Sequence, residues 1–170
     1  MRTLLERRFL GGRAVLASDV GKALEQRSLT LAVAESCTGG RLGDAITDVP
    51  GSSAYFLGGV ISYGNEAKFS LLKVDRSTLE SMGAVSEEVA LMMADGVRRQ
   101  LGASIGVGIT GIAGPTGATL AKPVGLVCIA VSSSERSLSA RSVFAGSRSD
   151  VKAQAVIKAL EMLSEFLSRG

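Results

Sequence analysis

Hydrophobic and polar positions along the 170-residue chain alternate between strand-like and helix-like patterns. Short apolar runs bounded by turn residues predict strands over residues 29–35, 56–63, 105–110, 124–131 and 138–144. Amphipathic stretches with capping residues predict helices over residues 15–27, 39–47, 66–73, 86–101 and 149–168. Because helices alternate with strands early and a hairpin follows late, the sequence predicts an α/β fold. We expect a three-layer α/β/α sandwich with a mixed central sheet and helices on both faces.

Single residues refine this outline. Ser18 or Asp19 could cap a shorter version of the first helix, and Asn65 is expected to be the N-cap of helix 66–73. Ser86 is expected to cap the helix that continues with two glutamates. Two adjacent glycines, Gly58 and Gly59, interrupt the second strand and predict a bulge or a close backbone approach. The last helix has an apolar stripe formed by Val151, Ala155, Ala159, Leu160, Leu163 and Leu167.

Composition and charge narrow the class of protein. Hydrophobic residues make up 46% of the chain, aromatic residues only 4%, and the 21 glycines predict small-residue packing and several glycine turns. We expect one domain over residues 15–170, preceded by an extension over residues 1–14. The net charge of +3 comes from scattered lysines and arginines, which argues against a nucleic-acid-binding surface. The longest apolar run is too short to cross a membrane, and without a signal peptide a cytoplasmic location is expected.

The chain contains no histidine and only two cysteines, Cys37 and Cys128. We therefore expect no disulfide framework and no metal site. A serine nucleophile could not use the familiar histidine base, so a lysine, a tyrosine or a carboxylate would have to take its proton.

The strongest local feature is the bend that follows the first strand. The apolar run ends at Glu35, then Ser36, Cys37 and Thr38 precede two glycines and a short helix. Such a strand–turn–helix junction exposes side chains at the sheet edge and leaves backbone N–H groups free to bind an anion. Ser36 could be a nucleophile or an ordinary turn hydroxyl. Cys37 could react as a thiolate or serve as a small buried thiol, while Glu35 is expected to organise the turn.

Three loops at strand ends, 35–40, 63–68 and 110–117, could converge on one site. Lys68 would lie in the first turn of its helix, where the helix dipole and partial burial both favour a neutral amine. Such an amine could take the proton of Ser36, whereas a solvated lysine could not. Tyr63 could donate to a substrate, relay that proton or simply end a strand. The glycine-rich loop and Arg148 could contact phosphate, or could be an ordinary connection and an exposed arginine.

Five motifs occur in order along the chain: AESCTGG (34–40), GGVISYGNEAK (58–68), GAVSEE (83–88), GITGIAGP (108–115) and KPVG (122–125). Together they closely resemble the C-terminal domain of the CinA (competence/damage-inducible) family, which includes stand-alone nicotinamide-nucleotide amidases. The resemblance extends from about residue 15 to the C-terminus. It implies an α/β/α fold, a homodimer or higher homo-oligomer, and hydrolysis of nicotinamide mononucleotide to nicotinate mononucleotide and ammonia without cofactor or metal.

The resemblance also implies roles for individual residues. The serine nucleophile, the lysine base and the assisting tyrosine of the family fall on Ser36, Lys68 and Tyr63. The family's substrate-contacting threonine falls on Thr110, and the basic residue of its late motif falls on Arg148. Independently of the resemblance, the turn residues Cys37, Thr38, Gly39 and Gly40 and the loop residue Gly111 are expected to contact the substrate, because backbone N–H groups in such turns can bind an oxyanion or a phosphate. In two places the chain departs from the family pattern: Ser147 replaces the usual acid beside Arg148, and Thr116 stands where glycine is common.

Two other functions are compatible with the same residues. A non-catalytic nucleotide-binding module, acting through a partner in competence or DNA-damage response, would use the same glycine loops. A cysteine hydrolase would use Cys37 in place of Ser36.

Overall fold

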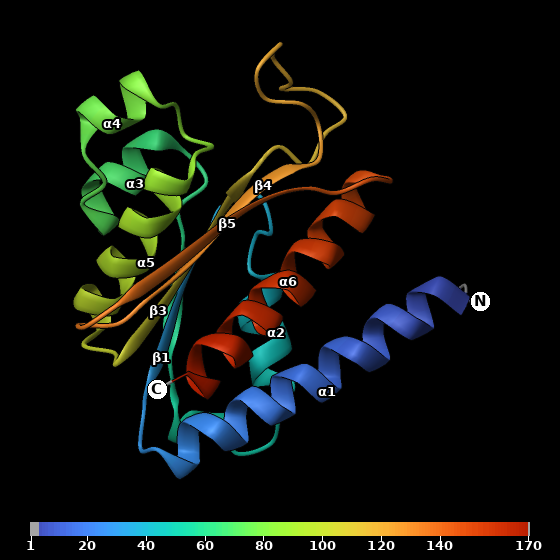
Figure 1. The fold of residues 1–170 in the computed structure, drawn as a ribbon, viewed down its shortest axis with the longest axis vertical. Helices are drawn as coiled ribbons and strands as arrows, with labels where there is room; N and C mark the ends of the chain where they lie inside the picture. Colours follow the sequence, from blue (N-terminus) through green and yellow to red (C-terminus); the bar gives the residue numbers. More distant parts are fainter. Residues whose placement is uncertain (1–3, 170) are drawn as a thin grey trace.

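The computed structural model describes residues 4–169, with side-chain surroundings given from residue 12 onward, and shows a mixed five-stranded sheet between two helical layers (Figure 1). The strands are β1 (Leu31–Glu35), β2 (Phe56–Ile61), β3 (Ile105–Gly111), β4 (Leu126–Ser132) and β5 (Ser137–Val143). The helices are α1 (Leu4–Gln26), α2 (Arg41–Thr47), α3 (Asn65–Leu72), α4 (Arg76–Ser81), α5 (Glu87–Leu101) and α6 (Arg148–Ser168), with a 3-10 turn over Ser52–Ala54. The predicted α/β/α sandwich is confirmed.

The strand order is β2-β1-β3-β4-β5. Strand β1 pairs in parallel with both β2 and β3, while β4 is antiparallel to β3 and to β5, which confirms the predicted hairpin. After β1 the chain moves outward to β2 and then crosses back to β3 on the other side of β1. Connections therefore diverge at the carboxyl end of β1, which is where open α/β sheets form ligand sites.

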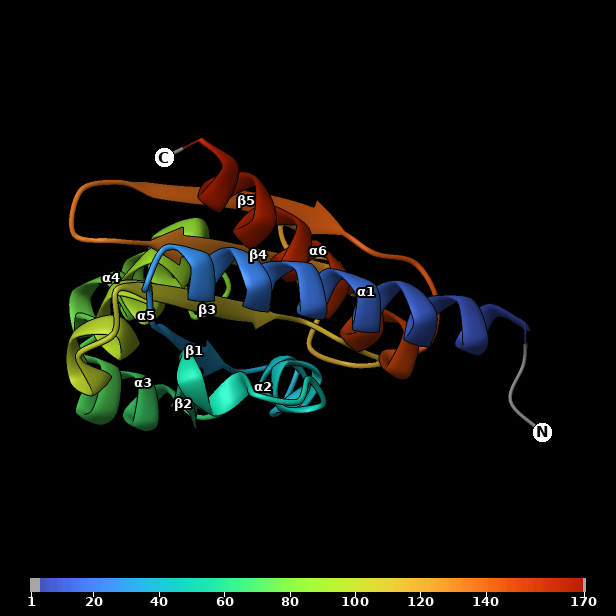
Figure 2. The same ribbon diagram turned by 90° about the horizontal axis from the view of Figure 1, so that it is seen from below.

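Helices α1, α2 and α6 cover one face of the sheet, and α3, α4 and α5 cover the other (Figures 1 and 2). The larger apolar cluster lies under α1, α2 and α6. It includes the whole stripe predicted on α6, whose six residues are all buried. A second cluster lies between β1 and α5.

Glycines bring α5 close to the sheet, as the composition predicted. A Cβ atom at Gly106 or Gly108 of β3 would lie 1.9 Å or 2.2 Å from the backbone oxygens of Ala94 and Ala90 on α5. At the sheet edge, the register between β1 and β2 shifts beside Gly58, whose φ of 135° lies in the region that favours glycine. The bulge predicted from the paired glycines is confirmed.

Several details differ from the sequence-based expectations. Helix α1 begins at Leu4 rather than at residue 15, so Ser18 and Asp19 lie within it and neither is a cap. The helix continues through its glycines despite their low helix propensity, and it packs along α6. Asn65 is the first residue of α3, and the extended Gly64 occupies the N-cap. Ser86 does cap α5, accepting the Val89 N–H.

Helix α4 was missed because its six residues carry only one buried apolar side chain, Leu79. The ends of the other predicted elements lie within two residues of those observed. Within residues 4–169, no helix combines the length and the apolar character needed to cross a bilayer.

Candidate active site

The loops that follow β1, β2 and β3 surround a cleft of about 300 Å³ at the carboxyl end of the parallel strands. Of the candidate catalytic and substrate-binding residues, those that line the cleft are Ser36, Cys37, Tyr63, Lys68, Thr110, Gly111 and Arg148. Thr38, Gly39 and Gly40 lie in the turn beside it rather than in its wall. Segments more than a hundred residues apart in the sequence thus converge on one cleft. The loops 35–40, 63–68 and 110–117 lie together there, as the sequence predicted.

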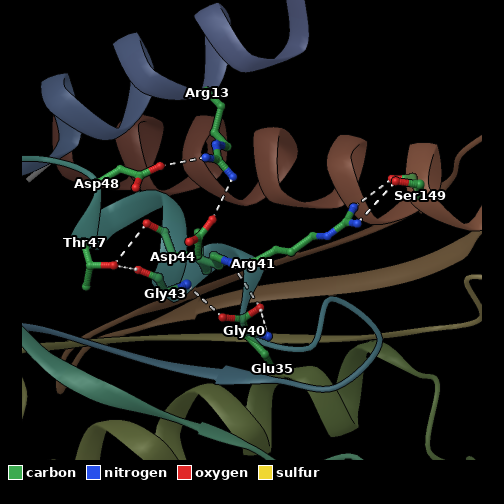
Figure 3. A network of polar contacts seen from close by, with 10 residues as sticks. Arg13, Glu35, Gly40, Arg41, Gly43, Asp44, Thr47, Asp48 and Ser149 are labelled. Atoms are coloured by element: carbon green, nitrogen blue, oxygen red, sulfur yellow. Dashed lines mark hydrogen bonds and ion pairs between the residues drawn. The ribbon is translucent and has the colours of Figure 1, made fainter. Parts of the chain in front are cut away.

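Glu35 holds the turn in place. Its carboxylate accepts the backbone N–H groups of Gly40, Leu42 and Gly43 at 3.0, 3.1 and 2.9 Å (Figure 3). The side chain is 2% exposed, so these are buried hydrogen bonds to a carboxylate placed at the start of α2. The expectation that Glu35 organises the turn is confirmed.

Ser36 and Lys68 meet under the cleft. Lys68 Nζ lies 3.1 Å from Ser36 Oγ, and the two residues are 1% and 7% exposed. The amine also donates to the backbone oxygen of Ser62 at 2.7 Å and, at the longer distance of 3.5 Å, to that of Tyr63. The Ser36 N–H donates to Ile109 O at 3.0 Å, which fixes the serine against β3.

Burial lowers the pKa of Lys68 from its ordinary value of 10.5, and the neighbouring Cys37 partly offsets this effect. The lysine lies one turn into α3, where the helix dipole also disfavours the ammonium form. A neutral amine has two N–H donors and one lone pair. With the donors directed at the two carbonyl oxygens, the lone pair can accept the Ser36 hydroxyl proton.

The same turn offers backbone donors next to Ser36. Gly39 N–H donates to Ser36 O at 3.1 Å, and Gly40 N–H is held by Glu35. The N–H groups of Cys37 and Thr38, by contrast, donate to no oxygen within the described part of the chain. They are the amides available to an oxyanion formed at Ser36.

Cys37 is a poor alternative nucleophile in this setting. Burial raises the pKa of its thiol to about 12, so the group is a neutral thiol at physiological pH. Its side chain belongs to the larger apolar cluster. A small buried thiol, one of the two roles considered for it, describes Cys37 as the structure shows it.

Arg148 closes the ring of loops around the cleft. Its guanidinium donates to Tyr63 OH and to Gly114 O, each at 2.8 Å. The phenol of Tyr63 is therefore bonded to Arg148 rather than to Ser36 or Lys68. The Thr110 hydroxyl donates to Ala84 O at 2.7 Å and so joins β3 to the segment before α5.

Sequence reasoning missed two basic residues beside the turn, Arg41 and Lys152. Lys152 Nζ would lie 3.4 Å from a Cβ placed on Gly39, and Arg41 donates to the Ser149 backbone oxygen at 3.0 Å. The spacing of Arg148 and Lys152 was a usable signal, because residues four apart in a helix share one face. Nothing comparable in the sequence connected Arg41 to α6.

The fold and the order of the site motifs can be compared with known proteins. The model of the CinA C-terminal domain matches residues 13–167. The chain belongs to this family. A CinA-like protein from Acaryochloris marina is 62% identical over 124 residues, which are 73% of the chain and 30% of that protein. A CinA-like protein from Chlorobium limicola is 57% identical over 123 residues, which are 72% of the chain and 29% of that protein.

Solved structures of CinA proteins share the whole fold. A CinA superfamily protein from Klebsiella pneumoniae has a TM-score of 0.90 at 35% identity, covering 93% of this chain and 99% of that one. The competence/damage inducible protein CihA from Agrobacterium tumefaciens has a TM-score of 0.89 at 37% identity, and the match covers 92% of this chain and 96% of that one. The chain spans about a third of the length of the curated relatives that it matches.

Proposed function

We propose that this CinA-family domain is an amidohydrolase that converts nicotinamide mononucleotide to nicotinate mononucleotide and ammonia. The observation that supports the proposal is the buried contact of 3.1 Å between Lys68 Nζ and Ser36 Oγ. A nearly inaccessible lysine with a lowered pKa, bonded to a hydroxyl at the edge of a cleft, has the features of an activated nucleophile. The carboxamide substrate follows from the family resemblance of the motifs that carry these two residues.

In the acylation half of the reaction, Ser36 Oγ attacks the carboxamide carbon while neutral Lys68 takes the hydroxyl proton. The carbonyl π electrons move to oxygen and form a tetrahedral oxyanion, which the N–H groups of Cys37 and Thr38 stabilise. The oxyanion then collapses, the C–N bond breaks, and the Lys68 ammonium gives its proton to the departing nitrogen. Ammonia leaves, and an ester joins the acyl group to Ser36.

Deacylation repeats these proton transfers with water in place of the serine. Lys68 takes a proton from water as the oxygen attacks the ester carbon. The second oxyanion collapses, the bond to Ser36 Oγ breaks, and Lys68 returns the proton to the serine. The products are the original enzyme and the carboxylic acid, which releases its proton to solvent and leaves as the carboxylate. Removal of one oxyanion donor typically costs about 2.7–4 kcal/mol of transition-state stabilisation, so the turn amides are a major part of the proposal.

The test is release of ammonia from nicotinamide mononucleotide by the wild-type protein and by Ser36→Ala, Lys68→Ala and Cys37→Ser. We expect Ser36→Ala and Lys68→Ala to fall to the level of a protein-free control, and Cys37→Ser to keep its activity. Circular dichroism of each variant checks that the fold is retained. Unchanged turnover in Ser36→Ala or Lys68→Ala would reject that residue's role, and no turnover by the wild type would reject the substrate.

A further inference from the structure

Strand β2 forms an open edge of the sheet. It pairs with β1 on one side, and no strand of the described residues lies on its other side (Figure 2). The Ser62 N–H donates to Glu35 O at 2.8 Å, so the alternation of the backbone turns the N–H and C=O groups of Gly59 and Ile61 away from β1. These groups are main-chain donors and acceptors that another extended strand can bind.

This edge lacks the features that usually keep edge strands from associating. The residues of β2, FLGGVI, include no charged residue and no proline. Leu57 and Ile61 are 45% and 57% exposed on the same face of the strand, with Gly59 between them. The bulge lies before Gly58, and from there to Ile61 the register with β1 is regular. The second half of β2 is therefore a straight, apolar and unprotected edge.

The opposite edge of the sheet is protected. Strand β5 carries three serines and Arg141 among its seven residues. Arg141 donates to Ala121 O at 3.2 Å, and Ser139 donates to Glu87 at 2.7 Å. A two-fold contact between two β5 edges would bring like charges together, whereas a contact between two β2 edges brings none together on the strands.

Exposed apolar side chains continue from β2 onto the helix that follows it. Phe69 and Leu71 of α3 are both exposed, and in Figure 2 α3 and β2 lie along the same border of the molecule. A two-fold axis perpendicular to the sheet keeps both copies of α3 on one face and makes them antiparallel. Glu66 in the first turn of α3, which pairs with Arg76 and is still largely exposed, then lies toward Lys73 at the other end of the second α3. The charges at the two ends of α3 thus complement those of a second copy.

We propose that a second copy of this chain binds the edge of β2 in antiparallel orientation and so joins two five-stranded sheets into one continuous sheet. The family resemblance implies a homo-oligomer without indicating its surface, and this edge supplies one. With the two-fold axis at Gly59, Leu57 of each copy lies opposite Ile61 of the other, and no side chain occupies the centre. The inference is independent of the proposed reaction, because its test needs no substrate.

Sedimentation equilibrium of the full chain measures the association. The wild type is compared with Leu57→Lys, Ile61→Lys and Val143→Lys, after circular dichroism has confirmed the fold of each. Val143 is the matched control, an exposed apolar residue of the other edge strand, β5. We expect a wild-type dimer. Leu57→Lys and Ile61→Lys should raise its dissociation constant by at least about tenfold, because each places an ammonium group in the apolar centre of the contact, and Val143→Lys should leave it unchanged.

Two further measurements test how the copies pair. The amides of Gly59 and Ile61 should exchange hydrogen slowly in the wild-type dimer and quickly in monomeric Leu57→Lys. For the register, the double variant Leu57→Cys/Ile61→Cys should give covalent dimers on mild oxidation, and neither single variant should. Directly opposite Cα atoms lie about 5.5 Å apart, which is within the range of a disulfide.

Four results would overturn the inference. They are a monomeric wild type, unchanged association of Leu57→Lys and Ile61→Lys, an equal loss in Val143→Lys, and a wild-type dimer in which the Gly59 and Ile61 amides exchange quickly. Covalent dimers from a single cysteine variant would contradict the axis at Gly59.

Discussion

Glu35 and Ser36 are adjacent residues whose side chains form hydrogen bonds on opposite faces of the sheet. The Glu35 carboxylate accepts three amides at the start of α2, in the layer that also contains α1 and α6. The Ser36 hydroxyl meets Lys68 of α3, in the other layer. This opposition follows from the alternation of side chains along an extended strand. The residue that shapes the turn and the proposed nucleophile can therefore be changed separately.

Replacing Glu35 by Gln should destabilise the domain. An amide group cannot accept all three N–H groups, because its NH2 would face at least one of them, donor against donor. The free energy of unfolding should fall by about 1–3 kcal/mol, as expected for a buried hydrogen-bonding group left unsatisfied. Urea unfolding measures the change. Glu161→Gln, on the exposed face of α6, is the control and should stay within about 0.5 kcal/mol of wild type; equal stabilities of Glu35→Gln and wild type would contradict the assignment.

Two glycine-to-alanine substitutions should change the free energy of unfolding in opposite directions. A Cβ on Gly108 would lie 2.2 Å from Ala90 O, so Gly108→Ala must push α5 away from β3 and should cost about 1–3 kcal/mol. Gly12 lies in α1 with nothing within 4 Å of its Cβ position, so Gly12→Ala should stabilise the domain by about 1 kcal/mol through helix propensity. Thermal and urea unfolding of both variants checks the signs. A neutral Gly108→Ala would show that the layers are not closely packed there.

Tyr63 and Arg148 should act on turnover as one unit. The phenol and the guanidinium are joined at 2.8 Å, so removing either partner releases the other. In a double-mutant cycle with Tyr63→Phe and Arg148→Gln, the losses in kcat/KM should overlap, with a coupling energy of about 0.5–3 kcal/mol. Additive losses would instead mean that Tyr63 acts on the substrate or on the Ser36 proton independently of Arg148.

The lowered pKa of Lys68 should also appear in the pH dependence of stability. Between the folded pKa and the unfolded value of 10.5, the unfolded chain carries a proton that the folded chain lacks. The free energy of unfolding therefore rises with pH across this window and loses that contribution as pH falls through the folded pKa. The difference between wild type and Lys68→Met should rise with pH, by at most about 1.4 kcal/mol per pH unit. Urea unfolding from pH 7 to pH 10 measures it, and a flat difference would contradict the lowered pKa.

The parts of the fold and site that the sequence predicted are those set by neighbouring residues. The bend after β1, the Ser86 cap and the apolar stripe of α6 are encoded within a few turns of chain. Lys68 could be singled out because its place near the start of a helix has a known electrostatic effect. The five ordered motifs then connected these local features to one family.

The parts that were missed depend on how distant elements pack. Helix α1 packs along α6, so its stability depends on a distant element as well as on its own propensity. Lys152 reaches Gly39 only because α6 docks beside the turn, 113 positions earlier in the chain. Arg41 was missed for the same reason, because its hydrogen bond to Ser149 exists only where α6 lies beside α2. Side-chain neighbours of this kind follow from the tertiary arrangement and have no local pattern.

The central claim is that a neutral Lys68 takes the proton of Ser36. The most direct test is the pH dependence of kcat/KM for nicotinamide mononucleotide, measured as ammonia release with a protein-free control at each pH. On this account the rate rises with pH with unit slope and levels off at an apparent pKa below 10.5, and Lys68→Met shows no such rise because it lacks the base. A rate that still climbs at pH 10.5, or a Lys68→Met variant with the wild-type rate and profile, would contradict it.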